Sequence, residues 1–256
     1  MSTGRKPTVV VTGASGLIGG LVLKNLGERF DFRAVNRRRV EGVPCWQADV
    51  ADFDAIRPAF EGADAVVHLS AYTQDIHQWE GTLSVNIVGT YNVFEAARQA
   101  GVRRVVFASS GSTMLGYEKE YPYGELARGE YEKVPDKWTL ITHLWPVRPD
   151  SIYGVSKVFG EVLGRYYSDY HGLSVVCLRI GAVLDTDRPK LVRHFPGYLS
   201  QADIVQAIRL ALEAPESLRY TVCDIISDNR WRWRDIEHAR RVLGYVPTGS
   251  SDGFTL

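Results

Sequence analysis

A tyrosine and a lysine stand four positions apart in the segment Tyr153-Gly154-Val155-Ser156-Lys157. On a helix, side chains at this spacing share one face, so the lysine ammonium can lie beside the phenol. A nearby positive charge stabilises the phenolate and lowers the phenol pKa, which is about 10 in free tyrosine. A base that works near pH 7 needs a decrease of about 3 units, or roughly 4 kcal/mol. The pair is therefore a candidate for proton transfer, provided that its surroundings support that chemistry.

A glycine-rich turn near the start of the chain supplies such surroundings. Residues 8–12 (TVVVT) predict a buried strand, and an amphipathic helix follows the turn and runs to about residue 28. Gly13 permits the tight turn, Gly16 lets the backbone approach a pyrophosphate at the helix N-terminus, and Gly19 lets the helix pack close to the strand. Strand, turn and helix in this order predict a dinucleotide-binding site.

The rest of the chain alternates between strand and helix patterns, which favours an α/β fold with a doubly wound parallel (Rossmann) sheet. Strands are expected near residues 8–12, 32–36, 44–48, 64–69, 103–108, 174–180 and 219–226, and helices near 17–28, 53–60, 82–100, 152–171, 201–213 and 233–243. We expect residues 1–180 to form the dinucleotide-binding domain. Residues 181–256 are expected to form a small substrate-binding portion packed on it, giving one compact unit.

One segment breaks the alternation. Residues 117–150 are rich in aromatic and charged side chains and in proline, and they form an insertion near the expected active site. Long loops beside active sites are often functional. A lid over the site and a surface excursion are the two interpretations of this insertion.

Composition is that of an ordinary globular protein, with 45% hydrophobic and 23% charged residues and a formal net charge of zero. The balanced charge gives no indication of a nucleic-acid or anionic-membrane partner. Cys45, Cys177 and Cys223 are isolated, so no metal site is expected, and each is interpreted as a small buried hydrophobic residue. We see no signal peptide and no apolar run near the ~18 residues that span a membrane. The reducing cytoplasm is the expected compartment.

The glycine spacing G-x-x-G-x-x-G, together with the YGVSK segment, resembles the extended short-chain dehydrogenase/reductase (NAD-dependent epimerase/dehydratase) family over nearly the whole chain. Residues 66–71 (VVHLSA) resemble the end of the family's fourth strand, under the nicotinamide half of the cofactor. Residues 85–90 (VNIVGT) resemble the helix that carries a structural asparagine, and residues 105–110 (VVFASS) resemble the strand that ends at the catalytic serine.

The resemblance implies roles for the candidate catalytic residues. Tyr153 would remove a proton from a substrate hydroxyl while hydride leaves for the nicotinamide, and Lys157 would lower the tyrosine pKa and hold the nicotinamide ribose. Ser110 would hydrogen-bond the reacting oxygen. Ser112 is a competing choice for this serine, because the stretch after Gly111 is longer than expected. Asn86 would support the helix backbone and a proton-relay water.

The cofactor preference depends on the end of the second strand, where an acidic residue usually binds the adenosine ribose. Here Asn36 is followed by Arg37 and Arg38, and an arginine can bind a 2′-phosphate that asparagine does not repel. The sequence therefore favours NADP, with NAD as the alternative. The cofactor-binding residues expected from the motifs and the resemblance are Gly13, Ser15, Gly16, Leu17, Ile18, Gly19, Asn36, Arg37, Arg38, Asp49, Val50, Leu69, Ser70, Ala71, Asn86, Tyr153, Lys157 and Ile180.

The C-terminal part resembles the uronate dehydrogenase subgroup, which includes enzymes that oxidise an aldose or a sugar phosphate at C1. Residues 178–181 (LRIG), Arg193 and residues 226–229 (ISDN) carry this resemblance. It implies oxidation of a hemiacetal to a lactone, with Arg193 meeting an anionic group of the substrate. The subgroup has Asn-His after the catalytic serine, whereas this chain has Gly111-Ser112, which puts uronate itself in doubt. Expected substrate residues are Ser112, Tyr72 and Arg193, and the expected partner is a small sugar or sugar acid.

Two other functions remain open. A sugar epimerase or dehydratase of the same fold would begin with the same hydride abstraction, although dehydratases usually add carboxylates after the catalytic serine. A non-catalytic dinucleotide-binding protein would often lack the tyrosine–lysine pair. The family also commonly dimerises through the helices near residues 82–100 and 152–171, so we expect a homodimer. Apolar residues on these helices that could form the interface are Val88, Tyr91, Val93, Phe94, Val158, Leu163 and Tyr166.

Overall fold

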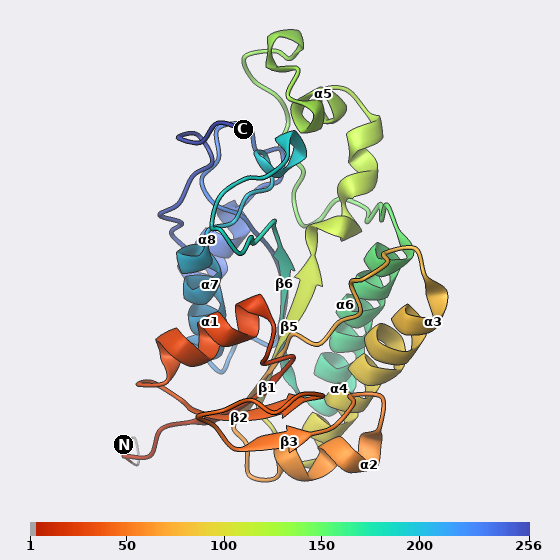
Figure 1. Cartoon of the computed structure of the whole chain (residues 1–256), viewed down its shortest axis with the longest axis vertical. Helices are drawn as coiled ribbons and strands as arrows, with labels where there is room; N and C mark the ends of the chain where they lie inside the picture. The colour runs from red at the N-terminus through yellow and green to blue at the C-terminus, as the bar shows by residue number, and fades with distance from the viewer. Residues whose placement is uncertain (1–3) are drawn as a thin grey trace.

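The computed structural model describes residues 4–256 and contains one seven-stranded, fully parallel sheet of order β3-β2-β1-β4-β5-β6-β7 (Figure 1). The strands are β1 (Thr8–Thr12), β2 (Asp31–Asn36), β3 (Cys45–Gln47), β4 (Ala65–His68), β5 (Arg104–Ser110), β6 (Ser174–Ile180) and β7 (Tyr220–Ile225). Every strand predicted from the sequence is present. The central strands β1 and β4 could be recognised because strands buried on both faces have near-continuous apolar runs. The α/β doubly wound fold is confirmed.

Helices cover both faces of the sheet. The α-helices are α1 (Leu17–Leu26), α2 (Phe53–Ile56), α3 (Trp79–Gly81), α4 (Gly89–Gln99), α5 (Tyr123–Arg128), α6 (Ile152–His171), α7 (Gln201–Glu213) and α8 (Glu237–Leu243). Figure 1 shows α1, α7 and α8 on one face and α2, α4 and α6 on the other. Each face has its own hydrophobic core. Because β1 lies between β2 and β4, the chain leaves β1 at the switch point of the sheet, where ligands of such folds bind.

The predicted helix at residues 82–100 is not one regular α-helix. Its first half is a π-helical segment, η2 (Thr82–Val88), which continues into α4. π-helical turns inside helices often accompany functional sites. This one contains Asn86, which is buried and faces the loop after β4 and the start of α6.

The insertion at residues 117–150 has its own short elements and a hydrophobic core. It folds as η4 (Leu115–Lys119), α5 and η5 (Tyr131–Lys133), at the top of the molecule in Figure 1. The buried members of this third core are Met114, Tyr117, Tyr123, Leu126, Ile141 and Trp233. The insertion is therefore packed against the C-terminal part of the chain and does not extend as an unsupported loop.

This packing also corrects the predicted helix at residues 233–243, which begins only at Glu237. The preceding residues are extended and pair with the insertion. The backbone N–H of Ile141 donates to the Trp233 carbonyl (2.8 Å), and the N–H of Asp235 donates to the Ile141 carbonyl (2.9 Å). Long-range pairing thus overrides the local helical pattern.

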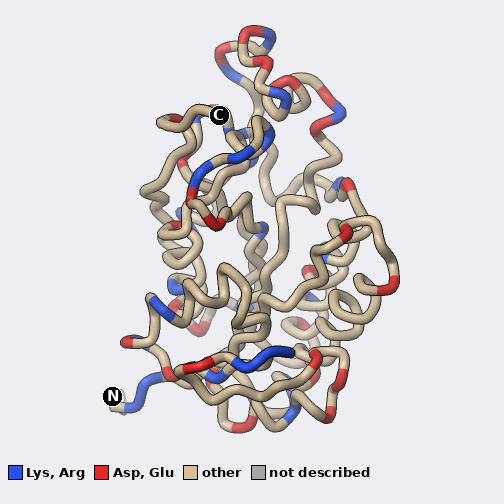
Figure 2. The backbone as a smooth tube through the Cα atoms, viewed as in Figure 1, with Lys and Arg blue, Asp and Glu red and all other residues tan. Residues whose placement is uncertain are grey.

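Charges are mixed over the described chain, apart from a short basic run at the carboxyl end of β2 (Figure 2). Within residues 4–256, no helix has both the length and the apolar character needed to cross a bilayer. The same residues contain no cluster of three or more His, Cys, Asp or Glu side chains placed to hold a metal ion.

Candidate active site

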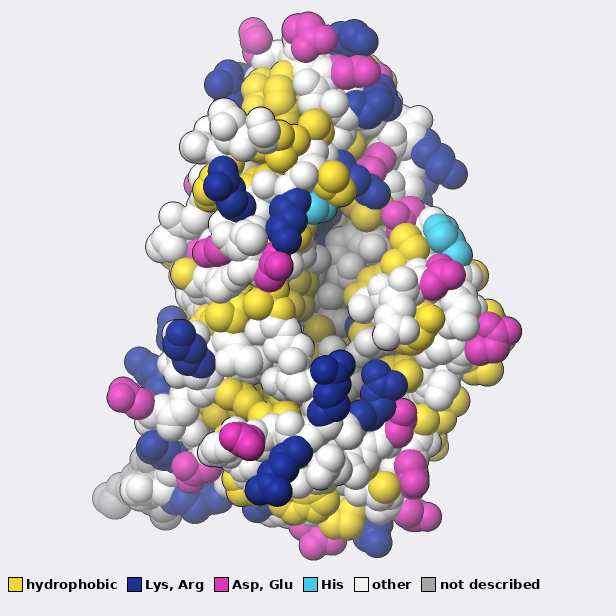
Figure 3. All heavy atoms as spheres, in the orientation of Figure 1, with side chains coloured by type: hydrophobic (Ala, Val, Ile, Leu, Met, Phe, Trp, Pro, Cys, Tyr) yellow, Lys and Arg dark blue, Asp and Glu magenta, His cyan; other side chains and the backbone are white. Residues whose placement is uncertain are grey.

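A cavity of about 580 Å³ lies at the carboxyl ends of the central strands, within the usual range for cofactor and ligand sites. Figure 3 shows the hollow between the sheet region and the upper part that carries the insertion. The predicted site residues that line it are Gly13, Ser15, Gly16, Leu17, Ile18, Gly19, Asn36, Arg37, Arg38, Asp49, Val50, Leu69, Ser70, Ala71, Tyr72, Ser110, Tyr153, Lys157 and Ile180. Asn86, Ser112 and Arg193 lie outside this lining.

The glycine turn forms one wall of the cavity. Gly13 has a φ of +70°, and a Cβ there would lie 2.8 Å from the backbone nitrogen of Ser70. A Cβ at Gly19 would lie 2.7 Å from the Cα of Ala14, so only glycine permits this contact between helix and turn. Gly16 is the N-cap of α1, and the first residues of this helix, Leu17, Ile18 and Gly19, line the cavity. These features fit a pyrophosphate held at a helix N-terminus.

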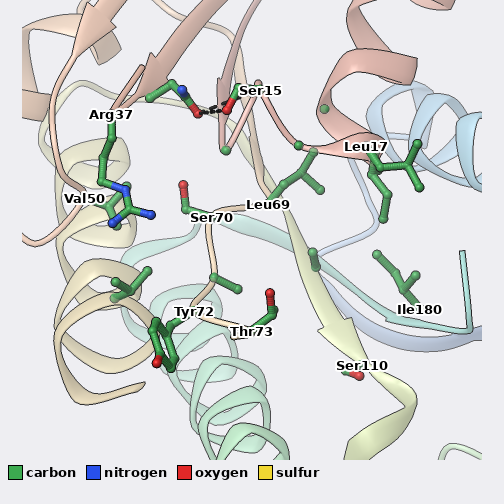
Figure 4. A pocket seen from close by; sticks show the side chains of 18 of the residues that line it. Ser15, Leu17, Arg37, Val50, Leu69, Ser70, Tyr72, Thr73, Ser110 and Ile180 are labelled. Carbon is green, nitrogen blue, oxygen red and sulfur yellow. Dashed lines mark hydrogen bonds between the residues drawn. The ribbon is translucent and has the colours of Figure 1, made fainter. Parts of the chain in front are cut away.

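Asn36, which is buried at the end of β2, organises the end of the cavity where the adenosine of a cofactor is expected. Its Oδ1 accepts hydrogen bonds from the backbone N–H (3.3 Å) and the hydroxyl (3.2 Å) of Ser15, as Figure 4 shows, and its Nδ2 donates to the Arg38 carbonyl (2.7 Å). In Figure 4 the Arg37 guanidinium extends into the cavity beside Val50. Asn36 thus ties the glycine turn to β2, and the arginines supply the charge at this end.

The catalytic candidates meet at the opposite end of the cavity. Tyr153 lies in the first turn of α6, and Ser151 caps this helix by accepting the Gly154 N–H (3.1 Å). A Cβ at Gly154 would lie 2.6 Å from the Ser112 carbonyl, so glycine lets α6 approach the turn that follows β5. The Lys157 Nζ lies 5.4 Å from the centre of the Tyr153 ring. Ser110, at the end of β5, completes the group.

Burial governs the ionisation of this group. It raises the pKa of Tyr153 to about 12, against the lowering effect of a hydrogen bond with Ser110. It lowers the pKa of Lys157 to about 8, because the ammonium is enclosed beside apolar groups such as the Phe107 ring. Desolvation of the phenolate is thus the dominant effect on Tyr153 in this structure. The lowering of the tyrosine pKa by Lys157 stays a prediction.

Asn86 acts on the site through its neighbours. Its Oδ1 accepts the Tyr72 backbone N–H (2.7 Å), and its Nδ2 donates to the Ser156 hydroxyl (3.0 Å). The Ser156 hydroxyl in turn donates to the Tyr153 carbonyl (2.7 Å). The amide therefore fixes the loop after β4 against the first turn of α6.

The two candidate serines have different positions. Ser110 lines the cavity, and its Oγ accepts the backbone N–H of Ser112 (3.1 Å), which holds the turn together. Between them, Gly111 lies against Arg234, whose Nη1 would be 2.8 Å from a Cβ at position 111. Arg234 is buried and ion-paired with Asp224 (2.9 Å). The missing side chain at position 111 is thus explained by the arginine that occupies its space.

Arg193 is half exposed, and its Nη2 lies 3.0 Å from the Glu118 Oε2. Tyr72 lines the cavity directly. Thr73, Gln74, Gly181 and Val183 also line it but were not predicted from the sequence. They lie beside predicted positions in irregular loops, where only adjacency to the motifs could have indicated them.

His68 is a structural residue. It is buried, with Nδ1 2.7 Å from the Thr12 hydroxyl and Nε2 3.1 Å from the Thr90 hydroxyl. Burial, reinforced by the Lys157 charge, lowers its pKa to about 3. The imidazole is neutral and packed between the end of β1 and the start of α4.

Comparison with known proteins agrees with this geometry. The chain is 38% identical over 255 residues to the L-arabinose 1-dehydrogenase (NAD(P)(+)) of Haloferax volcanii, covering 95% of this chain and 97% of that protein. It is 35% identical over 257 residues to the NAD-dependent glucose-6-phosphate dehydrogenase of the same organism, covering 96% and 95%. The crystal structure of uronate dehydrogenase from Agrobacterium tumefaciens matches with a TM-score of 0.82 at 31% identity, covering 97% of this chain and 87% of that one.

The sequence model of the NAD dependent epimerase/dehydratase family matches residues 9–200, which include the glycine turn and the tyrosine–lysine pair. Family match, relatives and fold therefore agree: the chain belongs to the NAD-dependent epimerase/dehydratase family, the extended short-chain dehydrogenases/reductases.

Proposed function

We propose that this protein is an NAD(P)-dependent dehydrogenase that oxidises the C1 hydroxyl of a sugar to the lactone. The observation that carries the proposal is that Tyr153, Lys157 and Ser110 line one end of a cavity that also has the glycine turn as a wall. The arrangement suits a reaction in which hydride and proton leave one carbinol group together. The relatives named above act on sugars or sugar phosphates, which supports a sugar substrate.

Each of these residues has a distinct role in the proposed reaction. Ser110 donates a hydrogen bond to the C1 oxygen and holds it as a carbonyl develops. Tyr153 accepts the hydroxyl proton as the hydride leaves C1. When bound, oxidised NAD(P) supplies the hydride acceptor and a positive charge. Burial raises the pKa of Tyr153 to about 12, so the positive charges of Lys157 and of the oxidised cofactor would favour the phenolate as the proton is taken.

We propose NADP as the preferred cofactor. Arg37 and Arg38 line the adenosine end of the cavity, and Asn36 places no negative charge beside a 2′-phosphate. A guanidinium binds phosphate through paired hydrogen bonds. NAD would bind through the same glycine cradle.

We propose that residues 181–256 contribute the substrate side, together with Tyr72, Ser112 and Arg193. The protein is further proposed to be a homodimer of the cytoplasm. Among the predicted interface residues, Val88, Tyr91 and Tyr166 are exposed, which supports a partner surface on η2, α4 and α6. Val93 and Phe94 are fully buried against the sheet, so the sequence-based inclusion of these two was wrong.

The test is to incubate the purified protein with NAD or NADP and a panel of free aldoses, uronates and sugar phosphates. Accumulation of reduced cofactor together with a lactone would support the proposal. Conversion of a sugar without net reduction of the cofactor would indicate an epimerase or dehydratase. Cofactor binding without conversion of any sugar would indicate a non-catalytic dinucleotide-binding protein.

A further inference from the structure

A buried glutamate joins the helix that carries Tyr153 to the strand that ends at Ser110. Tyr153, Lys157 and Glu161 follow one another at intervals of four residues on α6, so they share one face of this helix. α6 packs across β5 and β6 (Figure 1). The Glu161 Oε1 accepts a hydrogen bond from the hydroxyl of Ser109 (2.6 Å), which directly precedes Ser110 on β5 and lines the cavity. The carboxylate thus holds the end of β5 against α6.

An arginine on β6 fixes this carboxylate in place. Arg179 donates from Nε to the Glu161 Oε1 (2.8 Å) and from Nη2 to Oε2 (2.8 Å), the paired geometry that makes arginine–carboxylate bonds strong and directional. The Arg179 side chain is 3% exposed and that of Glu161 is 6% exposed, so water does not compete for these bonds. Together with the bond from Ser109, the carboxylate cannot rotate without breaking three hydrogen bonds.

Arg179 also contacts the segment that follows Ser110. Its Nη1 donates to the Met114 Sδ (3.3 Å), and Met114 is fully buried shortly after the turn that begins beyond Ser110. Ser110 is therefore held on both sides, through Ser109 before it and through Met114 after it. Both connections lead to Glu161, so the position of Ser110 relative to α6 depends on this carboxylate.

We propose that Glu161 is a positioning residue, which sets the distance between the Ser110 and Tyr153 hydroxyls. The inference rests on the proposed dehydrogenase function, in which these two hydroxyls meet the same C1 oxygen. Glu161 and Arg179 lie outside the cavity lining, so they act through Ser109 and not by contact with the sugar or the cofactor. A displacement of about 1 Å between reacting groups can slow a reaction by roughly 100-fold.

The first test is Ser109→Ala, which removes the bond from β5 to Glu161 and leaves the ion pair with Arg179 intact. The probes are L-arabinose, D-glucuronate and glucose 6-phosphate with NADP and with NAD, compared for the pair that the wild type converts fastest. Single-turnover stopped-flow, with the protein in excess over the cofactor and the sugar saturating, gives the rate constant of cofactor reduction for the folded molecules alone. We expect this rate constant to fall about tenfold or more, with the KM for the cofactor unchanged.

Ser174→Ala is the matched control. Ser174 is also a buried serine on a strand, and its hydroxyl accepts a hydrogen bond from the buried Arg104 Nε (3.0 Å), but it lies at the amino end of β6, away from the cavity. This variant should lose stability without any change in the rate constant. An unchanged rate constant in Ser109→Ala, or an equal decrease in both variants, would overturn the positioning role.

A second variant separates positioning from stability. Glu161→Leu/Arg179→Met replaces the buried ion pair by apolar side chains of similar size, which often leaves the stability of a protein unchanged or raises it. We expect it to unfold in urea at a concentration near that of the wild type, and to reduce the cofactor at least tenfold more slowly. A wild-type rate constant in this variant would contradict the inference.

Adding Ser109→Ala to the double variant should have no further effect, because the serine acts only through Glu161. A further decrease would show that Ser109 contacts the reactants directly, contrary to the inference. In each of these cases the dehydrogenase function would stand. Absence of turnover of every sugar by the wild type would overturn the proposed function and this inference together.

Discussion

Gly111 lies directly against Arg234: a Cβ at this position would be 2.8 Å from Nη1 and 2.9 Å from Cζ of the guanidinium. Arg234 cannot move away freely, because it is buried and bonded to Asp224 and to the Arg179 carbonyl. The turn that carries Ser110 therefore packs against a buried ion pair. The position of Ser110, the proposed catalytic serine, thus depends on the absence of a side chain at position 111.

Gly111→Ala should accordingly damage both stability and catalysis. We expect the free energy of unfolding to fall by about 1–3 kcal/mol, as for other overpacked sites. We also expect kcat to fall, because Ser110 shifts with the turn. Urea unfolding and steady-state kinetics would measure the two effects. Gly20→Ala is the control, since a Cβ there meets no atom within 4 Å and alanine favours a helix; a loss of similar size in both variants would refute the explanation.

Lys157→Met should lower the activity and raise the stability of the folded protein. The pKa of Lys157 is lowered to about 8 from 10.5, so the unfolded chain binds the proton more tightly than the folded one. The loss of unfolding free energy that results from burying the ammonium is fully present below pH 8. It disappears as the pH rises from 8 to 10.5. Replacing the ammonium should therefore raise the unfolding free energy at pH 7 by roughly 3 kcal/mol, and kcat should fall about 100-fold or more.

The pH dependence provides the check on this interpretation. The free energy of unfolding of the wild type should rise as the pH rises above 8, and this rise should be absent in Lys157→Met. Chemical denaturation at pH 7 and pH 10 would measure it. A variant that is less stable than the wild type at pH 7 would show that the lysine stabilises the fold, contrary to this account.

Arg37→Ala/Arg38→Ala should change the cofactor preference. Both side chains line the adenosine end of the cavity, and each guanidinium can bind a 2′-phosphate that only NADP carries. We expect kcat/KM for NADP to fall by about tenfold or more, with little change for NAD. Arg39→Ala is the neighbouring control. Equal losses for both cofactors would mean that the arginines do not distinguish them.

A charge placed on the exposed face of α6 should dissociate the proposed dimer. Val162 is 65% exposed and Tyr166 is 48% exposed, one turn apart on this helix. Val162→Glu/Tyr166→Glu would place two carboxylates in an apolar interface, which is costly. Sedimentation should show a dimer for the wild type and a monomer for the variant. Sedimentation of the wild type as a monomer would contradict the proposed homodimer.

The parts of the fold that could be predicted from the sequence are those encoded by local patterns. Buried strands such as β1 are continuous apolar runs, and the glycine turn and the YGVSK segment are short motifs with fixed spacing. The insertion could not be predicted in the same way, because its partners are remote. Trp138 donates its indole N–H to the Arg232 carbonyl (3.0 Å), 94 residues away.

The same reason limited the prediction of the site. Arg193 was expected to meet an anionic group of the substrate, and its bond to Glu118 could not be foreseen, since Glu118 lies in a segment without a recognisable pattern. The tyrosine pKa was expected to decrease, because spacing reveals a neighbouring lysine but not the burial that raises the pKa to about 12. Both differences arise from tertiary packing and desolvation.

The central claim is that Tyr153 takes the proton when a sugar is oxidised. The most direct measurement compares wild type and Tyr153→Phe for formation of reduced cofactor and lactone, with binding of NADP or NAD measured by calorimetry on both. We predict that the variant binds the cofactor normally and loses about 100-fold or more in kcat. A variant that keeps most of the activity would contradict the account.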